Sequence, residues 1–158
     1  MSKVLDKLNE QMNFEYESAY IYKQMAMYAD DIDLPGFAHW LNAQSREEIE
    51  HAEKMLDFLQ DVGYEAKLTG MSEPKADYEN IEEVVKTAFD HEKEVTRRIN
   101  EIADLAREED KRVYSFIQWY IDEQVEEEAN FDQLTTRLER INGNWSGLYI
   151  LDGELKHR

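Results

Sequence analysis

The sequence contains no cysteine, only two prolines and only six glycines among its 158 residues. Without cysteine the chain has no disulfide, no thiolate metal ligand and no thiol nucleophile, which is compatible with a reducing cytosol. Proline and glycine are the residues that most often interrupt helices, so their scarcity favours a few long ones. A chain of this length suits one domain with a sizeable core, and we expect residues 1–158 to form a single domain.

Continuous apolar stretches are also missing. The N-terminal segment MSKVLDKLNEQMN mixes charged and apolar residues, so we expect no signal peptide, no membrane span and a cytoplasmic location. Basic residues are few, with 18 Lys and Arg against 36 Asp and Glu, for a net charge of −18. Such a charge repels nucleic-acid phosphates and anionic lipid but attracts metal cations, so we expect no nucleic-acid partner.

Apolar residues recur at spacings of three and four in four long segments, which predicts an all-α four-helix bundle. We expect these helices at residues 3–29, 35–61, 81–107 and 111–141. Asn80 and Glu83 form a capping-box pattern before the third helix, and Gly63 and Gly143 follow the second and fourth. Short turns join the first helix to the second and the third to the fourth, so each of these pairs should be an antiparallel hairpin. The long link at 64–79 lets the second hairpin start at either end of the bundle.

One stripe along each helix is apolar at both ends and polar in the middle, and it is expected to end at Phe58 and Val62 on the second helix and at Leu138 and Ile141 on the fourth. The polar positions on the four helices are Glu15; Gln44, Glu48 and His51; Glu92; Gln124 and Glu127. An unpaired buried carboxylate costs several kcal/mol, so four at one level need protons or cations to neutralise them. Two divalent ions would cancel the charge of four carboxylates beside a neutral histidine.

The spacing of these residues repeats between the two hairpins. Glu48 and His51 stand at i and i+3, so that both side chains reach one ion. Glu15 precedes Glu48 by 33 residues, and Glu92 precedes Gln124 by 32. We therefore predict a buried, carboxylate-bridged two-metal site rather than a structural accident.

Five segments together resemble the non-haem ferritins of bacteria and archaea, over nearly the whole chain. They are LNEQMNFEYESAYIY, EEIEHAEKM, HEKEVTRRINE, FIQWYIDEQVEEE and GLYILDGEL. The resemblance implies an iron-storage ferritin subunit that binds Fe(II), oxidises it to Fe(III) with dioxygen or hydrogen peroxide at a site within one subunit, and stores it as a ferric mineral in a hollow shell. Ligand type alone also admits manganese or zinc, so iron rests on the resemblance.

Ferritin-like di-iron proteins as a class use one Glu from each of two helices and Glu-x-x-His from each of the others. The resemblance assigns the first ferroxidase iron to Glu15, Glu48 and His51. Glu48 bridges to the second iron, whose further neighbours are Glu92, Gln124 and Glu127.

A third iron site is typical of prokaryotic ferritins. The residues that match its ligands are Glu47, Glu123 and Glu126, with Glu127 between the second and third sites. Tyr22 corresponds to a tyrosine that the family keeps close to the di-iron centre.

The chain also departs from neighbouring families. A symmetric di-iron site would repeat Glu-x-x-His where this chain has Gln124 and Glu127, which should loosen the second metal and suit iron that moves on to storage. Bacterioferritins carry a haem-binding methionine where this chain has Ile49, so we expect no haem. Rubrerythrins need cysteine ligands. The small DNA-protecting ferritin relatives build their site between subunits, whereas these ligands lie within one bundle.

Two other functions fit the same ligands. One is a soluble di-iron peroxidase or oxidase that retains its metals, and the other is a structural or metal-buffering bundle without turnover. The amount of iron bound per assembly separates all three.

Apolar residues continue after the fourth helix, with Trp145 and Leu148 to Leu151. We expect a short fifth helix at about 145–156 that makes subunit contacts in a homo-oligomeric shell of 24 chains, the usual ferritin number; the alternative is a segment that folds back on its own bundle. Glu50 and Glu53 are expected to be solvated or to pair with Lys54. The histidines expected at the surface are His39, His91 and His157.

Overall fold

A computed structural model describes residues 2–158 and contains five α-helices within that range. They are α1 (Lys3–Asp31), α2 (Pro35–Asp61), α3 (Ile81–Glu109), α4 (Lys111–Ile141) and α5 (Trp145–Leu155). Every expected helix is present, and α1 and α3 each extend two residues further than predicted. The all-α four-helix bundle with a short fifth helix is therefore confirmed. No helix within residues 2–158 is long and apolar enough to cross a membrane.

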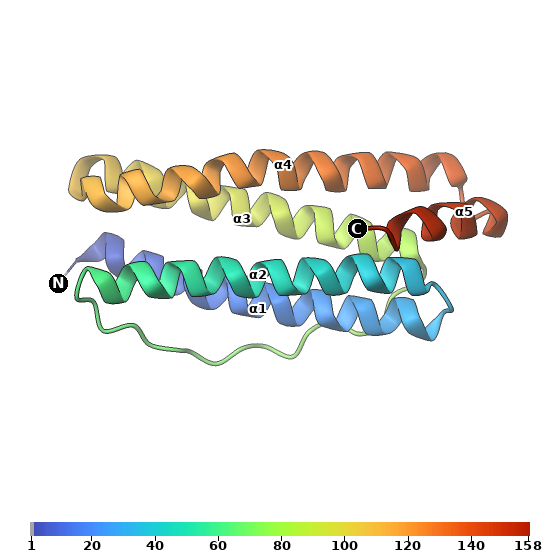
Figure 1. Ribbon diagram of the computed structural model, residues 1–158, viewed down its shortest axis with the longest axis horizontal. Coiled ribbons are helices and arrows are strands. Elements are labelled where there is room, and N and C mark those ends of the chain that lie inside the picture. The colour runs from blue at the N-terminus through green and yellow to red at the C-terminus, as the bar shows by residue number, and fades with distance from the viewer. Residues whose placement is uncertain (1) are drawn as a thin grey trace.

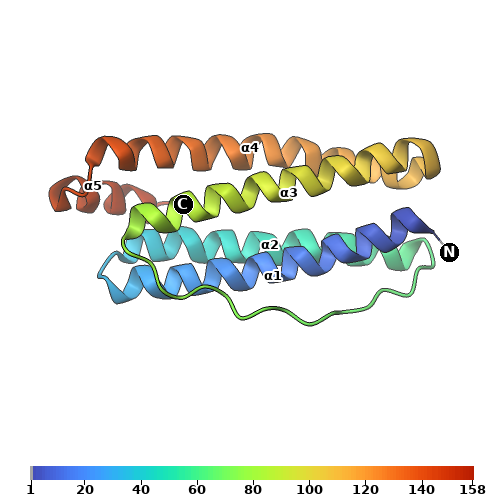
Figure 2. The same ribbon diagram turned by 180° about the vertical axis from the view of Figure 1, so that it is seen from behind.

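The link between α2 and α3 runs the whole length of the bundle (Figures 1 and 2). It therefore brings α3 to begin at the end where α1 turns into α2. Two asparagines of α1 hold this irregular segment: Asn9 Oδ1 accepts from the Lys67 amide at 3.0 Å, and Asn13 Oδ1 accepts from the Thr69 amide at 2.8 Å. These bonds satisfy backbone groups that no secondary structure pairs.

The helix ends follow the expected signals, with one difference. Asn80 Oδ1 accepts from the Glu83 amide at 2.8 Å, as in a capping box. The Glu83 carboxylate, however, accepts from the amide of Glu79, one residue before the usual partner. Gly63 and Gly143 have φ values of 80° and 76°, the left-handed conformation that glycine adopts most easily after a helix.

Two apolar clusters lie on either side of the polar middle layer. One includes Phe37 and Phe131 near the α1–α2 turn, and the other includes Leu8 and Ile117 near the opposite end. The expected stripes are buried except at the ends of α2 and α4: Phe58, Val62 and Ile141 are only partly buried, and Leu59 takes the inner position. An α-helix drifts by about 20° per heptad from a seven-residue stripe, so the inner face of α2 moves by one position near its end.

Helix α5 folds back on its own bundle with one face. Leu148 and Leu151 are buried in the cluster near the α1–α2 turn. On the other face Trp145, Tyr149 and Ile150 are 51%, 54% and 68% exposed. The segment thus follows the alternative expectation on one side and leaves an apolar surface on the other.

Candidate metal centre

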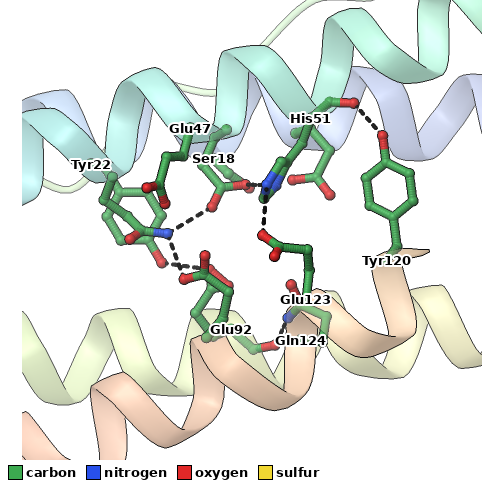
Figure 3. A network of polar contacts seen from close by, with 12 residues as sticks. Ser18, Tyr22, Glu47, His51, Glu92, Tyr120, Glu123 and Gln124 are labelled. Carbon is green, nitrogen blue, oxygen red and sulfur yellow. Dashed lines mark hydrogen bonds and ion pairs between the residues drawn. The ribbon is translucent and has the colours of Figure 1, made fainter. Parts of the chain in front are cut away.

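The polar layer brings side chains from all four long helices to the middle of the bundle (Figure 3). The five groups Glu15, Glu48, His51, Glu92 and Glu127 are each no more than 5% exposed. Each sits on the stripe that faces the core, because helical periodicity places them in line with the apolar residues above and below. The predicted register of all four helices is therefore correct at this level.

Three groups of ligand atoms form in this layer, and the atoms of each lie within 4.8 Å of one another. The groups are Glu15, Glu48 and His51; Glu48, Glu92 and Glu127; and His51, Glu123 and Glu127. Glu48 belongs to the first two groups, as expected for a bridge between two metals. Glu127 belongs to the second and third, as expected for a residue between those sites.

Hydrogen bonds hold the central carboxylates in place. The Gln44 amide group donates to Glu48 Oε1 at 3.0 Å and to Glu127 Oε2 at 2.8 Å. The Tyr22 hydroxyl donates to Glu92 Oε1 at 3.0 Å, so this tyrosine does lie beside the cluster. Gln44 was expected on the polar stripe, but its contact with two carboxylates depends on α4 and is not visible in sequence.

His51 has a carboxylate near each ring nitrogen. Nδ1 lies 3.5 Å from Glu48 Oε2, and Nε2 lies 3.4 Å from Glu123 Oε2. Its backbone carbonyl accepts a hydrogen bond from the Tyr120 hydroxyl at 2.6 Å. These contacts fix the imidazole between the first and third groups.

Burial and mutual repulsion set the protonation of the cluster. Burial first, and then the charge of Glu48, raise the pKa values of Glu15 and Glu92 well above the ordinary range. The same causes raise the pKa of Glu127 to about 7. Burial is the largest effect on Glu48 and works to raise its pKa, but hydrogen bonds from His51, Glu15 and Gln44 and the charge of His51 together lower it. Glu48 is therefore the ionised centre, and its neighbours hold protons that a cation would replace.

Burial and the neighbouring carboxylates shift the pKa of His51 in opposite directions. Burial is the largest effect and lowers the pKa of the imidazole, but the hydrogen bond and charge of Glu48 together with the charges of Glu127 and Glu123 raise it above the ordinary value. A protonated His51 partly neutralises the cluster in the metal-free chain, and metal binding requires that proton to leave.

The donor set fits divalent cations. The second carboxylate oxygens of Glu15 and Glu92 are buried and have no hydrogen-bond partner among residues 2–158. Buried polar atoms are rarely left unpaired, because desolvation without a partner costs about 1–3 kcal/mol. Carboxylates with one imidazole suit iron, manganese or zinc, and these two oxygens are free to bind such an ion.

The residues expected at a third site converge only in part. Glu123 joins His51 and Glu127, and its pKa is raised by burial first, against the charge of His51, and then by Glu126 and Glu47. Glu126 is exposed and Glu47 is half-buried, and neither lies within the 4.8 Å groups. The Glu47 carboxylate instead accepts from the Arg158 guanidinium at 2.9 Å.

Gln124 is buried at the expected level beside Glu92. Its Nε2 donates to the Glu92 backbone carbonyl at 3.2 Å and to Thr96 Oγ1 at 3.0 Å. The donor end of the amide is therefore directed to α3 rather than to the carboxylate groups of the cluster.

The prediction that His91 lies at the surface is wrong. Its Nε2 is 2.7 Å from Ser18 Oγ, its ring stacks on Phe14 at 5.1 Å, and burial lowers its pKa. The ring also meets Tyr22 edge-on, with the centroids 6.0 Å apart. His91 precedes Glu92 and faces α1, a contact that only the packing of α1 against α3 creates.

The other surface expectations agree with the structure. His39 and His157 are exposed. Glu50 and Glu53 are exposed as well, and Lys54 lies over the Trp119 ring, 3.5 Å from its centroid.

A family model, sequence relatives and solved structures all indicate the same family. Residues 5–141 match the model of a ferritin-like domain. A bacterial non-heme ferritin of Staphylococcus aureus strain MRSA252 is 39% identical over 156 residues, which cover 98% of this chain and 94% of that protein. A bacterial non-heme ferritin of Staphylococcus haemolyticus is 37% identical over the same length, with the same coverage. An open pore ferritin from the archaeon Archaeoglobus fulgidus matches with a TM-score of 0.97 and 40% identity, covering 100% of this chain and 98% of that one. The chain therefore belongs to the ferritin family and is a non-haem ferritin.

Proposed function

We propose that the chain is the subunit of an iron-storing shell and that its central cluster is a ferroxidase centre. The observation that carries this proposal is the convergence of four buried glutamates and one histidine from four helices, with two carboxylate oxygens left unpaired. Membership of the ferritin family supports iron as the substrate. The family also favours storage over an oxidase that retains its metals.

Fe(II) enters as a substrate that replaces protons. We infer that Glu15, Glu48 and His51 hold the first ion and that Glu92 and Glu127 hold the second, with Glu48 shared. Two divalent ions cancel the charge of the four carboxylates once the imidazole is neutral. The apolar clusters above and below keep the carboxylates from moving apart, because close-packed cores resist displacement.

The oxidation itself moves one electron from each Fe(II) to dioxygen or hydrogen peroxide. The protein contributes positioned ligands, and the redox chemistry belongs to the iron. The Tyr22 hydroxyl bond to Glu92 and the Gln44 bonds to Glu48 and Glu127 hold three carboxylates in the orientation that the ions need. Gln124 adds a neutral oxygen ligand near the second ion in place of a charged one.

The product leaves through the third group. Glu127 belongs both to the central cluster and to the group with His51 and Glu123, so it links the buried centre to the half-exposed Glu123. The exposed Glu126 and the half-buried Glu47 add negative charge that acts on Glu123. We propose that Fe(III) passes along these carboxylates to the mineral.

The storage function also requires a shell. Ferritin relatives imply a shell-forming oligomer with iron as its cargo, and we propose 24 chains, the usual number of the family, in the cytoplasm. The exposed apolar face of α5, with Trp145 and Tyr149, supplies one surface for subunit contact. A monomer or simple dimer by light scattering at micromolar concentration would contradict this proposal.

Aerobic loading of the native particle with Fe(II) tests the function as a whole. A storage protein takes up far more iron than the two ions per chain of the central cluster, and it consumes oxygen or peroxide as it does so. A constant two ions per chain would indicate a metal-retaining oxidase. Binding without oxidant consumption would indicate a metal buffer.

A further inference from the structure

The side chain of Arg158 lies against α2 and pairs with Glu47, one of the residues expected at the third iron site. After α4 the chain reverses direction, and α5 and the C-terminus run back along the bundle beside α2 (Figure 1). One guanidinium nitrogen, Nη2, donates to Glu47 Oε2 at 2.9 Å and to Gln44 Oε1 at 2.8 Å. The other, Nη1, donates to the Trp40 carbonyl at 3.0 Å, and the group lies over the Trp40 ring, 4.5 Å from its centroid. The Arg158 side chain is 21% exposed and the Glu47 side chain 42%, so the pair is only partly shielded from solvent.

Gln44 connects this arginine to the central cluster. A guanidinium has only donors, so the amide oxygen of Gln44 must face Arg158. The amide nitrogen then faces inward and donates to Glu48 and Glu127, the two carboxylates that the ligand groups share. Arg158 therefore decides which end of the Gln44 amide the carboxylates meet.

Glu47 is the point where Arg158 and a metal ion would compete. Burial raises the pKa of Glu123, and the negative charges of Glu126 and Glu47 raise it further, so Glu47 is close enough to act on Glu123. In the metal-free chain the guanidinium supplies the positive charge that this acidic group needs, and it stays charged at every pH in ordinary use. A cation that binds Glu47 Oε2 would displace the guanidinium, and a cation on the other oxygen would be repelled by its positive charge.

We propose that Arg158 is a built-in counter-ion that occupies Glu47 in the metal-free subunit and weakens cation binding at the outer group of Glu47, Glu123 and Glu126. This inference rests on the proposed function, in that the outer group is taken as a metal site. Arg158 is a positioning residue, since it acts on the outer group through Glu47. A weakly held ion at the outer group passes on to storage more readily than one held tightly.

Calorimetric titration of the assembled, metal-free protein with Zn²⁺, a redox-inert ion, tests the proposal. Changing Arg158→Gln frees Glu47, so the weakest zinc site should tighten by about three- to tenfold, the range expected for a partly exposed, hydrogen-bonded ion pair. Arg137→Gln is the matched control, because Arg137 pairs with Glu154 of α5 and makes no hydrogen bond or ion pair with α2 in the described part of the chain. That control should bind zinc as the parent does.

A Glu47→Gln background tests whether the change in zinc affinity depends on Glu47. In Glu47→Gln protein the competition is absent, so adding Arg158→Gln should leave zinc affinity unchanged. Tightening that persists in that background, or parent-like affinity in Arg158→Gln alone, would overturn the proposal. Should Arg158→Gln fail to assemble, Arg158→Lys takes its place in the titration. Lysine keeps the charge but loses the forked contacts, so the weakest zinc site should tighten by a smaller factor. Parent-like zinc affinity of Arg158→Lys would then contradict the proposal.

These outcomes are separate from failure of the proposed function. A parent protein that binds fewer than two zinc ions per chain would contradict the proposed ferroxidase centre itself. A parent that fills those sites, with no difference between the Arg158 and Arg137 variants, would contradict only the role of Arg158.

Discussion

Gly36 of α2 touches the backbone of Asp152 in α5 so closely that a Cβ atom added at Gly36 would lie 1.8 Å from the Asp152 carbonyl oxygen. The Asp152 carboxylate also accepts a hydrogen bond from the Phe37 amide at 2.8 Å. The N-cap residue of α2, Leu34, makes no side-chain capping bond. Helix α5 thus supplies, from a distant part of the chain, the negative group that the start of α2 favours.

Changing Gly36→Ala should therefore push α5 away from the bundle. The clash is with backbone, which cannot rotate aside, so we expect a loss of about 1–3 kcal/mol in the free energy of unfolding and exposure of Leu148 and Leu151. Thermal unfolding and binding of a hydrophobic dye measure both effects. Gly153→Ala is the control, because a Cβ there meets nothing within 4 Å. Equal behaviour of the two variants would mean that α5 is not docked in solution.

Changing Glu48→Ala should abolish fast Fe(II) oxidation without unfolding the bundle. The change removes the carboxylate shared by two ligand groups, but it also removes the charge that raises the pKa values of Glu15 and Glu92. Stopped-flow absorbance after mixing with oxygen should show an initial rate lower by more than about tenfold, since even outer-shell partners of a metal contribute that much. Glu50→Ala, an exposed change on the same helix, should leave the rate intact. A normal early rate in Glu48→Ala would place the oxidation elsewhere.

The metal-free protein should lose stability as pH rises. A carboxyl whose pKa is raised by folding is favourable while protonated, and this contribution disappears between the ordinary value of 4.5 and the folded value, about 7 for Glu127. The raised pKa of His51 acts in the same direction, whereas the lowered pKa of Glu48 acts oppositely, below 4.5. For Glu127 alone the shift corresponds to a change on the order of 3 kcal/mol.

Denaturant unfolding of the metal-free protein at a series of pH values across this window measures the loss. Glu127→Gln should flatten the curve, whereas Glu50→Gln should leave it unchanged. Saturating zinc should abolish or reverse the slope, because the ions replace the protons. A flat curve in the metal-free parent would show that the cluster is not buried as described.

Changing Gln124→Glu should add a charged ligand beside the proposed second ion. We expect zinc to bind that position about ten- to a hundredfold more tightly, because a charge-assisted contact contributes about 1.5–3 kcal/mol. The first round of Fe(II) oxidation should be normal and the second slower, since iron leaves less readily. The metal-free variant should be less stable at neutral pH, because a carboxylate replaces the amide that donates to Glu92 and Thr96.

Calorimetric titration with zinc and two successive rounds of oxidation kinetics measure these effects. Gln118→Glu is the control, because it adds the same charge at an exposed position of α4. Equal affinity and equal recovery of Gln124→Glu and the parent would mean that residue 124 does not act on the second ion.

Much of the centre is determined by local sequence alone. Helical periodicity decides which residues share a face, so the apolar stripes place Glu15, Glu48 and Glu92 inside the bundle before any contact is known. The spacing of Glu48 and His51 likewise predicts that both reach the same ion. Periodicity places Phe58 on the buried face of α2, but Leu59 is buried instead, because a straight helix drifts from a seven-residue stripe.

Tertiary structure alone decided the features that join distant parts of the chain. The link fits either direction of the second hairpin, and only packing selects the one in which it spans the bundle. His91 becomes partly buried because α3 packs on α1, and Gln44 meets Glu127 because α2 faces α4 across the core. Arg158 reaches Gln44 across 114 residues of sequence. Helical periodicity specifies the direction of a side chain around its own helix, whereas these contacts depend on the relative placement of two segments, which is set by the burial of both at once.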